Sequence, residues 1–319
     1  MLEYILFVFG LALLIKGGDW LVDGASSLAK RFGVPALVIG LTIVAFGTSL
    51  PEMIVSIMAV TQGSTDIAFG NIVGSNIANI LLILGLAAAI TPIAVQRSTI
   101  WKEIPFSFLA AALLFSFALG PYLDGTPNAV LRSEGLVLLM VFCIFLYYVI
   151  EMARAAPKAT SAEMGLHRHS GWIIALMLVG GLAALYFGGR WTVDGAVAIA
   201  RQLGLSEFLI SATIIAIGTS LPELVTTVMA ARKNDVDLAV GNIIGSNIFN
   251  ILWVMGVTAI IAPVALASTA LIDLGVLLGV TFLLFAFMFL KPKHELRRWQ
   301  GITFLVLYAG YLVFLVVRG

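Results

Sequence analysis

The chain has 319 residues and a formal net charge of +1; 61% of its residues are hydrophobic, only 11% are charged, and the mean hydropathy is +1.08. About a quarter of the residues of a soluble domain are charged, so this composition excludes a water-soluble fold and indicates that the chain lies in a lipid bilayer. The near-zero net charge does not suggest a nucleic-acid partner, and the single cysteine, Cys143, excludes an internal disulfide and a thiolate metal site.

Ten apolar stretches predict ten membrane-spanning helices, because each span needs roughly 20 apolar residues. We expect them at about 4–26, 35–61, 67–90, 104–119, 131–151, 171–193, 207–231, 238–261, 273–290 and 300–317. The first residues lack the positive region of a signal peptide and are interpreted as the start of the first span. Asp66 and Asp237 precede the third and eighth stretches, where we expect them to act as helix N-caps.

Two polar strings in this apolar chain occur twice, at a constant spacing of 171 residues. Gly-Thr-Ser-Leu-Pro-Glu spans 47–52 and 218–223, and Gly-Asn-x-x-Gly-Ser-Asn-x-x-Asn spans 70–79 and 241–250. Between 47–81 and 218–252, 20 of 35 positions are identical, which indicates an internal repeat. The sequence therefore predicts an all-α multi-pass membrane protein of two five-helix halves, 1–152 and 171–319, joined by a polar linker at 153–170.

The odd number of helices in each half makes the second half enter the membrane from the opposite side, which predicts an inverted repeat. The basic residues support this topology. With the N-terminus outside, thirteen Lys and Arg residues fall in inside loops and three in outside segments. We therefore expect a cytoplasmic linker, both termini outside, and a location in the plasma (inner) membrane.

Glu52 and Glu223 fall near the middle of the second and seventh predicted helices. An ionisable side chain at that depth is costly and by default marks a functional site. Each glutamate follows a proline, whose ring clashes with the carbonyl group four residues back, and that carbonyl belongs to a glycine. We therefore expect both helices to be broken at these residues: Gly47, Pro51, Gly218 and Pro222.

The broken helices predict an oxygen-rich cation site. Freed carbonyl groups, a carboxylate and two hydroxyls in each copy supply the ligands that Ca²⁺ prefers. Polar residues recur every four positions on the third and eighth helices, so each set forms one stripe that is expected to face the carboxylates. The expected site residues on these stripes are Ser75, Asn79, Ser246 and Asn250. Four further amides fit the site and interhelical hydrogen bonds equally well: Asn71, Asn76, Asn242 and Asn247.

Charged residues near the ends of the first and sixth helices are expected at the membrane interface rather than at the ion site. Asp23 and Asp194 match across the repeat, and Arg190 takes the place of Asp19. Arg190 is expected to pair with Asp194, four residues later on the same helix. All three histidines lie in predicted loops, and no stretch is long enough for a nucleotide-binding domain, so we expect transport to be driven by an ion gradient.

The repeated strings resemble those of the sodium/calcium exchanger family of the calcium/cation antiporter superfamily, especially its short prokaryotic members, and the resemblance covers the whole chain. It implies a calcium:sodium antiporter in which Glu52 and Glu223 bind Ca²⁺ and Na⁺ in turn. It also implies electrogenic transport by alternating access, with the first and sixth helices sliding across the other eight. The further ligands that it implies are Thr48, Ser49, Thr219, Ser220, Ser75, Asn79, Ser246 and Asn250.

The resemblance implies that the chain is not an enzyme and has no cofactor, and that its partners are the transported ions and the lipid bilayer, with no obligate protein partner. Many members carry Asp where this chain has Asn250, so two carboxylates rather than three are expected here, which argues against obligatory K⁺ co-transport. A calcium/proton antiporter, a cation channel and an intramembrane enzyme that uses the carboxylates as an acid–base pair remain as alternatives.

Overall fold

The structure is a computed structural model that describes residues 2–125, 127–155, 169–202, 216–266, 269–291 and 293–318. It is mostly helical, with four strands of two residues each in these ranges. Eight helical stretches in the described residues are long and apolar enough to cross a membrane, and two helices that meet at a bend of 43° make a ninth candidate. The multi-span helical architecture is therefore confirmed. Most of the predicted linker at 153–170, and residues 207–215 of the seventh predicted helix, lie outside the described residues.

The first half of the chain contains four of the eight single spans and the bent pair. Its elements are α1 (Leu2–Phe32), α2 (Ala36–Ile39), the π-helical segment η1 (Gly40–Val44), α3 (Ala45–Thr48), α4 (Leu50–Thr61), α5 (Thr65–Ala78), the π-helical segment η2 (Asn79–Leu84), α6 (Gly85–Ile90), β1 (Ile93–Ala94), α7 (Arg97–Trp101), α8 (Glu103–Leu123), β2 (Ala129–Val130) and α9 (Arg132–Ala155).

The second half repeats this order over its described residues. Its elements are α10 (Gly171–Gln202), α12 (Ala216–Gly218), α13 (Leu221–Arg232), α14 (Val236–Ile248), the π-helical segment η4 (Phe249–Met255), α15 (Gly256–Ile261), β3 (Val264–Ala265), α16 (Ala270–Phe287), β4 (Glu295–Leu296) and α17 (Arg298–Arg318).

The predicted N-caps of α5 and α14 are wrong by two residues. Ser64 and Asp235 precede the two helices, and the side chain of Asp235 accepts a hydrogen bond from the backbone N–H of Leu238 at 3.4 Å. Asp66 and Asp237 lie instead in the first helical turn. A carboxylate is favoured there as well, because the helix dipole places positive potential at the N-terminus.

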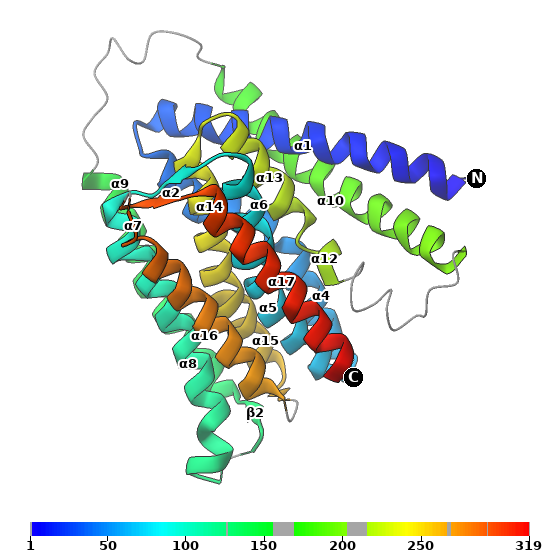
Figure 1. Ribbon diagram of the computed structural model, residues 1–319, viewed down its shortest axis with the longest axis vertical. Coiled ribbons are helices and arrows are strands. Elements are labelled where there is room, and N and C mark those ends of the chain that lie inside the picture. The colour runs from blue at the N-terminus through cyan, green and yellow to red at the C-terminus, as the bar shows by residue number, and fades with distance from the viewer. Residues whose placement is uncertain are drawn as a thin grey trace.

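Two short antiparallel ladders lie on opposite sides of the helical bundle. β1 pairs with β4, and β2 pairs with β3. We call the side that carries β1, β4, the end of α9 and the start of α10 the linker side, because residues 153–170 connect α9 to α10 there. The opposite side, which carries β2 and β3, is the far side (Figure 1).

Helices α1 and α10 lie side by side and cross the remaining helices obliquely (Figure 1). Glycines allow their backbones to approach closely. A Cβ added to Gly17 would lie 2.9 Å from the backbone nitrogen of Leu185, and one added to Gly188 would lie 2.8 Å from that of Leu14. These two glycines match across the repeat, so each helix of the pair brings a glycine at the same repeat position against the backbone of the other.

The centre of the bundle is formed by α5 and α14 together with their π-helical continuations. In these two stretches 78% and 83% of the apolar window is buried, whereas the outer spans are buried over 22–44% of theirs. The repeated polar residues of α5 and α14 therefore lie in the most enclosed part of the molecule, where the bilayer cannot reach them.

Candidate functional site

Both membrane glutamates lie in the first turn of a helix that follows a break. The helix α3 ends at Thr48 and α4 begins at Leu50, and α12 ends at Gly218 before α13 begins at Leu221. Pro51 and Pro222 stand in the first turn of the new helix, where a missing N–H does not cost a hydrogen bond. Each glutamate therefore lies at a helix N-terminus, where unpaired N–H groups and the helix dipole favour a negative charge.

The carboxylates of Glu52 and Glu223 are completely enclosed, with 0% and 1% of each residue exposed. Each accepts a hydrogen bond from the serine of the other half. Ser49 Oγ donates to Glu223 Oε1 at 3.2 Å, and Ser220 Oγ donates to Glu52 Oε1 at 3.3 Å. The two breaks therefore face each other, and the hydroxyl groups of each half bind the carboxylate of the other.

The threonines of the breaks make the same crossed contacts with the polar stripes. Thr48 Oγ1 donates to Asn242 Oδ1 at 3.1 Å and lies 3.5 Å from Ser246 Oγ, so it bonds to α14 of the second half. Thr219 Oγ1 donates to Asn71 Oδ1 at 3.3 Å, and so bonds to α5 of the first half. Hydrogen bonds between the halves thus fix the position of both breaks.

Asn71 and Asn242 support the backbone of the glutamates rather than their carboxylates. Asn71 Nδ2 donates to the carbonyl oxygen of Glu52 at 3.1 Å and to Ser56 Oγ at 3.0 Å. In the second half, Asn242 Nδ2 donates to the carbonyl oxygen of Glu223 at 3.5 Å and to a threonine hydroxyl, Thr227 Oγ1, at 2.9 Å. A carbonyl oxygen can accept two hydrogen bonds, so each amide adds a bond to a carbonyl in the first turn of α4 or α13 and holds that turn in place.

The two hydroxyls that accept bonds from these amides are parts of the candidate site that the sequence analysis did not single out. Ser56 and Thr227 are both fully buried, and they lie 171 residues apart. A hydroxyl at the same repeat position in two otherwise apolar helices was the signal that would have identified them.

Four asparagines join α5 to α14 at the centre of the molecule. Asn79 Nδ2 donates to Asn247 Oδ1 at 2.9 Å, and Asn250 Nδ2 donates to Asn76 Oδ1 at 3.3 Å. Asn76 and Asn247 also donate to each other's backbone carbonyl, in both cases at 3.4 Å. Of the two roles open to Asn76 and Asn247, the structure therefore shows the interhelical one.

Five side-chain oxygen atoms around this network are buried and have no hydrogen-bond partner. They are Glu52 Oε2, Glu223 Oε2, Ser75 Oγ, Asn79 Oδ1 and Asn250 Oδ1. A buried polar atom that is left unpaired costs about 1–3 kcal/mol, so five in one place are not expected without a partner. Oxygen donors of this kind are what Ca²⁺ and Na⁺ accept, and Ca²⁺ takes six to eight of them.

Two carboxylates are the only acidic groups of this site. No cluster of three or more His, Cys, Asp or Glu residues that is arranged to hold a metal ion occurs among the described residues. Neither Glu52 nor Glu223 belongs to the ion pairs formed within those ranges. The ionised site therefore has a charge of −2 that is free to be balanced by a cation.

Two cavities lie between the breaks and α10, and one of them extends toward the far side. One, of about 200 Å³, extends from Arg190 and Asp194 of α10 to Gly218 and Thr219. Arg190 and Asp194 form the expected ion pair, with Arg190 Nε 3.8 Å from Asp194 Oδ2, and both side chains are about two-thirds exposed. The second cavity, of about 250 Å³, reaches Gly47. Both cavities therefore lie beside the breaks, and neither is lined by Glu52 or Glu223.

Glycine at each break permits close contact with α10. A Cβ added to Gly47 would lie 2.6 Å from Leu182 Cδ2, and one added to Gly218 would lie 2.5 Å from Val193 Cγ2.

All ten predicted ligands lie on the two breaks or on the two stripes between them, and Thr219 is the one among them that is only half-buried.

Comparison with known proteins supports the family resemblance that the repeated strings indicate. A family model described as "Sodium/calcium exchanger protein" matches residues 2–151 and 173–317. The sodium/calcium exchanger MaX1 of Methanosarcina acetivorans is 31% identical over 345 aligned positions, covering 98% of each chain, and the inner membrane protein YrbG of Escherichia coli is 37% identical over 99% of this chain and 97% of its own. A solved structure of the sodium-calcium exchanger NCX_Mj, soaked with Na⁺ and Ca²⁺, superposes with a TM-score of 0.83 at 34% identity, covering 98% of both chains. The chain therefore belongs to the sodium/calcium exchanger family.

Proposed function

We propose that this protein is a Ca²⁺/Na⁺ antiporter that binds its ions between Glu52 and Glu223. The observation that carries the proposal is the group of five buried oxygen atoms without a partner, two of them carboxylate oxygens, at the centre of the bundle. A bound cation would pair all five, and their chemistry fits the hard cations that the family's name specifies.

We infer electrogenic exchange from the resemblance to the sodium/calcium exchanger family, since the charge of the site does not by itself fix the number of Na⁺. Two ionised carboxylates balance one Ca²⁺ or two Na⁺, so a third Na⁺ leaves a net positive charge on the loaded carrier. The exchange of three or more Na⁺ for one Ca²⁺ then moves charge across the membrane, which is worth about 2.3 kcal/mol per elementary charge per 100 mV.

Alternating access is the mechanism that the packing supports. One cavity extends from the far half of α10 to the second break, and the pair α1–α10 lies across the helices that carry the site (Figure 1). We infer that this pair slides as a unit to move the opening to the linker side. The empty site would keep its charge of −2 next to apolar helices, which opposes sliding without an ion.

The distribution of basic residues favours a cytoplasmic linker side. We therefore propose a plasma-membrane protein whose ten spans form two inverted five-helix repeats and whose termini are both outside. Lys233, in the loop after α13, and Arg97, at the start of α7, belong to this basic set. Cysteines introduced into the ends of the chain, labelled in intact cells with a membrane-impermeant thiol reagent, test the orientation.

The experiment that tests the function is ⁴⁵Ca²⁺ uptake into Na⁺-loaded proteoliposomes. The parent is compared with Glu52→Gln and Glu223→Gln. Glu103→Gln is the matched control, because Glu103 is as completely buried as the site glutamates but accepts its hydrogen bond from Tyr148 of α9, outside the site. We expect uptake that needs internal Na⁺, persists without K⁺, generates a membrane potential, and is lost in both site variants but not in the control.

The alternative functions give different results in the same vesicles. Uptake that follows a pH gradient and ignores Na⁺ would establish a calcium/proton antiporter. A Ca²⁺ current that needs no counter-ion would establish a channel. Uptake that survives both substitutions would show that the two glutamates do not form the ion site. A Glu52→Gln protein that keeps a hydrolytic activity would revive the enzyme alternative.

A further inference from the structure

The two sides of the molecule differ in how α1 and α10 meet the helices behind them. Gly18 of α1 and Gly189 of α10 occupy matching positions of the repeat. On the linker side, a Cβ added to Gly18 would lie only 2.7 Å from Val225 Cγ1 of α13. On the far side, a Cβ added to Gly189 would have Leu14 Cδ2 of α1 as its nearest neighbour, at 3.9 Å, and Gly189 lines the cavity. In the part of the chain that the structure describes, α1 is therefore packed against α13 on the linker side, whereas the matching position of α10 lines a cavity on the far side.

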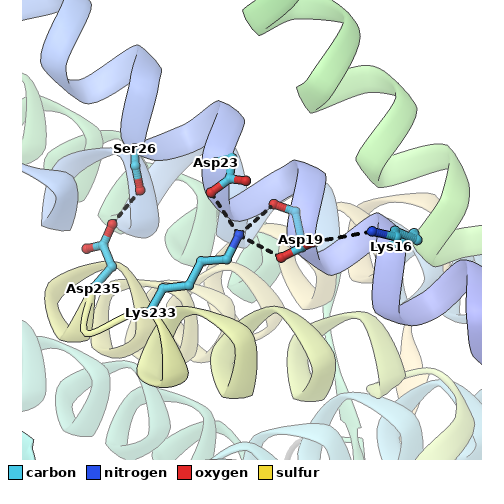
Figure 2. A network of polar contacts seen from close by, with 6 residues as sticks. All are labelled: Lys16, Asp19, Asp23, Ser26, Lys233 and Asp235. Atoms are coloured by element: carbon cyan, nitrogen blue, oxygen red, sulfur yellow. Dashed lines mark hydrogen bonds and ion pairs between the residues drawn. The ribbon is translucent and has the colours of Figure 1, made fainter. Parts of the chain in front are cut away.

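Ion pairs reinforce the closed contact. Lys233, in the loop between α13 and α14, places its Nζ 2.7 Å from Asp19 Oδ1 and 2.8 Å from Asp23 Oδ1, both on α1. The same ammonium group donates to the backbone carbonyl oxygen of Asp19 at 3.3 Å. Figure 2 shows the lysine reaching across from its loop to lie between the two carboxylates. One cation thus holds two successive turns of α1.

A second contact ties the same loop to α1. Ser26 Oγ donates a hydrogen bond to the carboxylate of Asp235 (Figure 2). The other carboxylate oxygen of Asp235 accepts the N-cap bond of α14 at 3.4 Å from Leu238 N. The loop is thus fixed to α14 while it holds α1. We call these five residues the linker-side latch: Asp19, Asp23, Ser26, Lys233 and Asp235.

The far side has no equivalent of the latch at the matching residues. The positions 171 residues away are Arg190, Asp194, Val197, Gln62 and Ser64. Glutamine takes the place of the bridging lysine, valine that of the serine, and serine that of the loop aspartate. Arg190 and Asp194 pair within α10, where both are mostly exposed to solvent. An inverted repeat that is symmetric at its ion site is therefore asymmetric in what closes its two sides.

We propose that the linker-side latch holds α1 against the α13–α14 loop and thereby favours the state that is open on the far side. The inference rests on the proposed alternating access, because the latch acts on the step in which α1 moves. Displacement of α1 along its axis separates Lys233 from both carboxylates and Ser26 from Asp235. The movement that opens the linker side therefore costs more free energy than the matching movement that opens the far side. The latch sets the resting orientation of the carrier.

The protonation state of Lys233 allows it to hold the two carboxylates of α1. Burial alone would lower its pKa, but the hydrogen bonds and charges of Asp19 and Asp23 outweigh burial and raise the pKa above its ordinary value. The lysine therefore stays positively charged at physiological pH. Its side chain is 30% exposed, so the pairs are screened only in part, and several partners on one cation form a network rather than an isolated surface pair.

The test measures the accessibility of each side with introduced cysteines. Cys143→Ser removes the single native thiol. Val22→Cys reports on the linker side, since Val22 follows Gly18 by one turn of α1 and is 1% exposed. Val55→Cys reports on the far side, where Val55 lines the cavity. Labelling rates with a hydrophilic maleimide are compared between the parent and Lys233→Gln in lipid nanodiscs.

We expect Lys233→Gln to speed the labelling of the linker-side cysteine by roughly three- to fivefold, the shift that about two weak ion pairs supply, while the far-side cysteine reacts no faster. Lys233→Arg keeps the charge and is expected to react like the parent. Lys16→Gln is the matched control, because Lys16 pairs with Asp19 within α1, at 3.9 Å, and does not bridge to the loop.

Three outcomes overturn the latch: an unchanged linker-side rate in Lys233→Gln, an equal increase in Lys16→Gln, or faster labelling of both reporters, which indicates general loosening. Size-exclusion profiles of the variants identify any that are misfolded, and Asp23→Asn, which removes one partner of Lys233 on α1, then decides the question through its own linker-side labelling rate. ⁴⁵Ca²⁺ uptake by the parent is measured in parallel. A parent without Na⁺-dependent uptake refutes the proposed function, whereas a transporting parent with unchanged labelling refutes the latch alone.

Discussion

A matched pair of glycine substitutions tests whether the structure is closed on the linker side. Gly18→Ala adds a methyl group where α1 touches α13, and Gly189→Ala adds one at the matching position of α10. Alanine favours a helix over glycine by about 1 kcal/mol in both variants. That gain is the same whether a side is open or closed, so any difference between the variants reports the local contact.

The free-energy cost of the added methyl group follows from its distances to neighbouring atoms. The new methyl carbon at residue 18 lies 2.7 Å from Val225 Cγ1 and 3.4 Å from Met229 Cγ, whereas an ordinary carbon–carbon contact is about 3.5–4.0 Å. Valine in a helix has one strongly preferred rotamer, so its methyl group cannot turn away freely. Overpacking of this kind costs about 1–3 kcal/mol. A value of about 1.4 kcal/mol shifts the ratio of open to closed linker side about tenfold. At residue 189 the nearest atom, Leu14 Cδ2, is at 3.9 Å, and no such cost arises.

Hydrogen–deuterium exchange measures both sides in one experiment. In Gly18→Ala we expect exchange of peptides from residues 225–236 to rise by about tenfold relative to the parent. In Gly189→Ala we expect peptides from residues 52–64 to exchange at the parent rate. Equal responses of the two variants would refute the assignment of a closed linker side and an open far side.

Three further predictions concern other contacts. The accessibility of the linker side stays constant between about pH 6 and pH 9, since a raised pKa keeps Lys233 charged until the pH rises through it; cysteine labelling across that range checks this. Asn247→Ala leaves the buried Asn79 Nδ2 without its acceptor and lowers the free energy of unfolding by about 1–3 kcal/mol, which thermal unfolding in detergent measures. Arg318→Ala removes two hydrogen bonds, of 2.9 and 3.0 Å, from Asp273. The loss destabilises the far-side end of α17 by about 1–3 kcal/mol, and hydrogen–deuterium exchange of that end is expected to be faster.

Much of the architecture could be predicted because lipid restricts the choices. Apolar stretches of about 20 residues can only be spans, and a polar repeat at constant spacing identifies matching helices without knowledge of their packing. The order of helices, the position of the breaks and the burial of Glu52 and Glu223 all follow from these patterns. The family prediction rested on the same residues and is confirmed.

The crossed bonding of the site was not predictable from local pattern. Ser49 lies three residues before Glu52 in the sequence, and local reasoning assigns the two to one half of the site. In the structure Ser49 bonds to Glu223 instead. Which half supplies a hydroxyl to which carboxylate depends on how two distant segments face each other, and single-sequence periodicity contains no such information.

Helix ends were also predicted imperfectly, for a physical reason. Asp66 and Asp237 are plausible caps by residue type, but Ser64 and Asp235 occupy the cap positions. An aspartate in the first turn interacts favourably with the helix dipole just as a capping aspartate does, so composition alone does not separate the two positions. The partnership of Lys233 with α1 was missed because it joins residues more than 200 positions apart.

The crossed hydroxyls mean that neither half of the chain is a complete unit. Thr48 and Ser49 bond to the second half, and Thr219 and Ser220 to the first. A free-standing half could build the same site only as an antiparallel pair with an inverted copy of itself. Such a pair would be forced to keep both faces identical, because one sequence would supply them. Fusion of two copies into one polypeptide removes that constraint, so that a difference such as Gln62 in one half against Lys233 in the other allows the two sides of the molecule to differ.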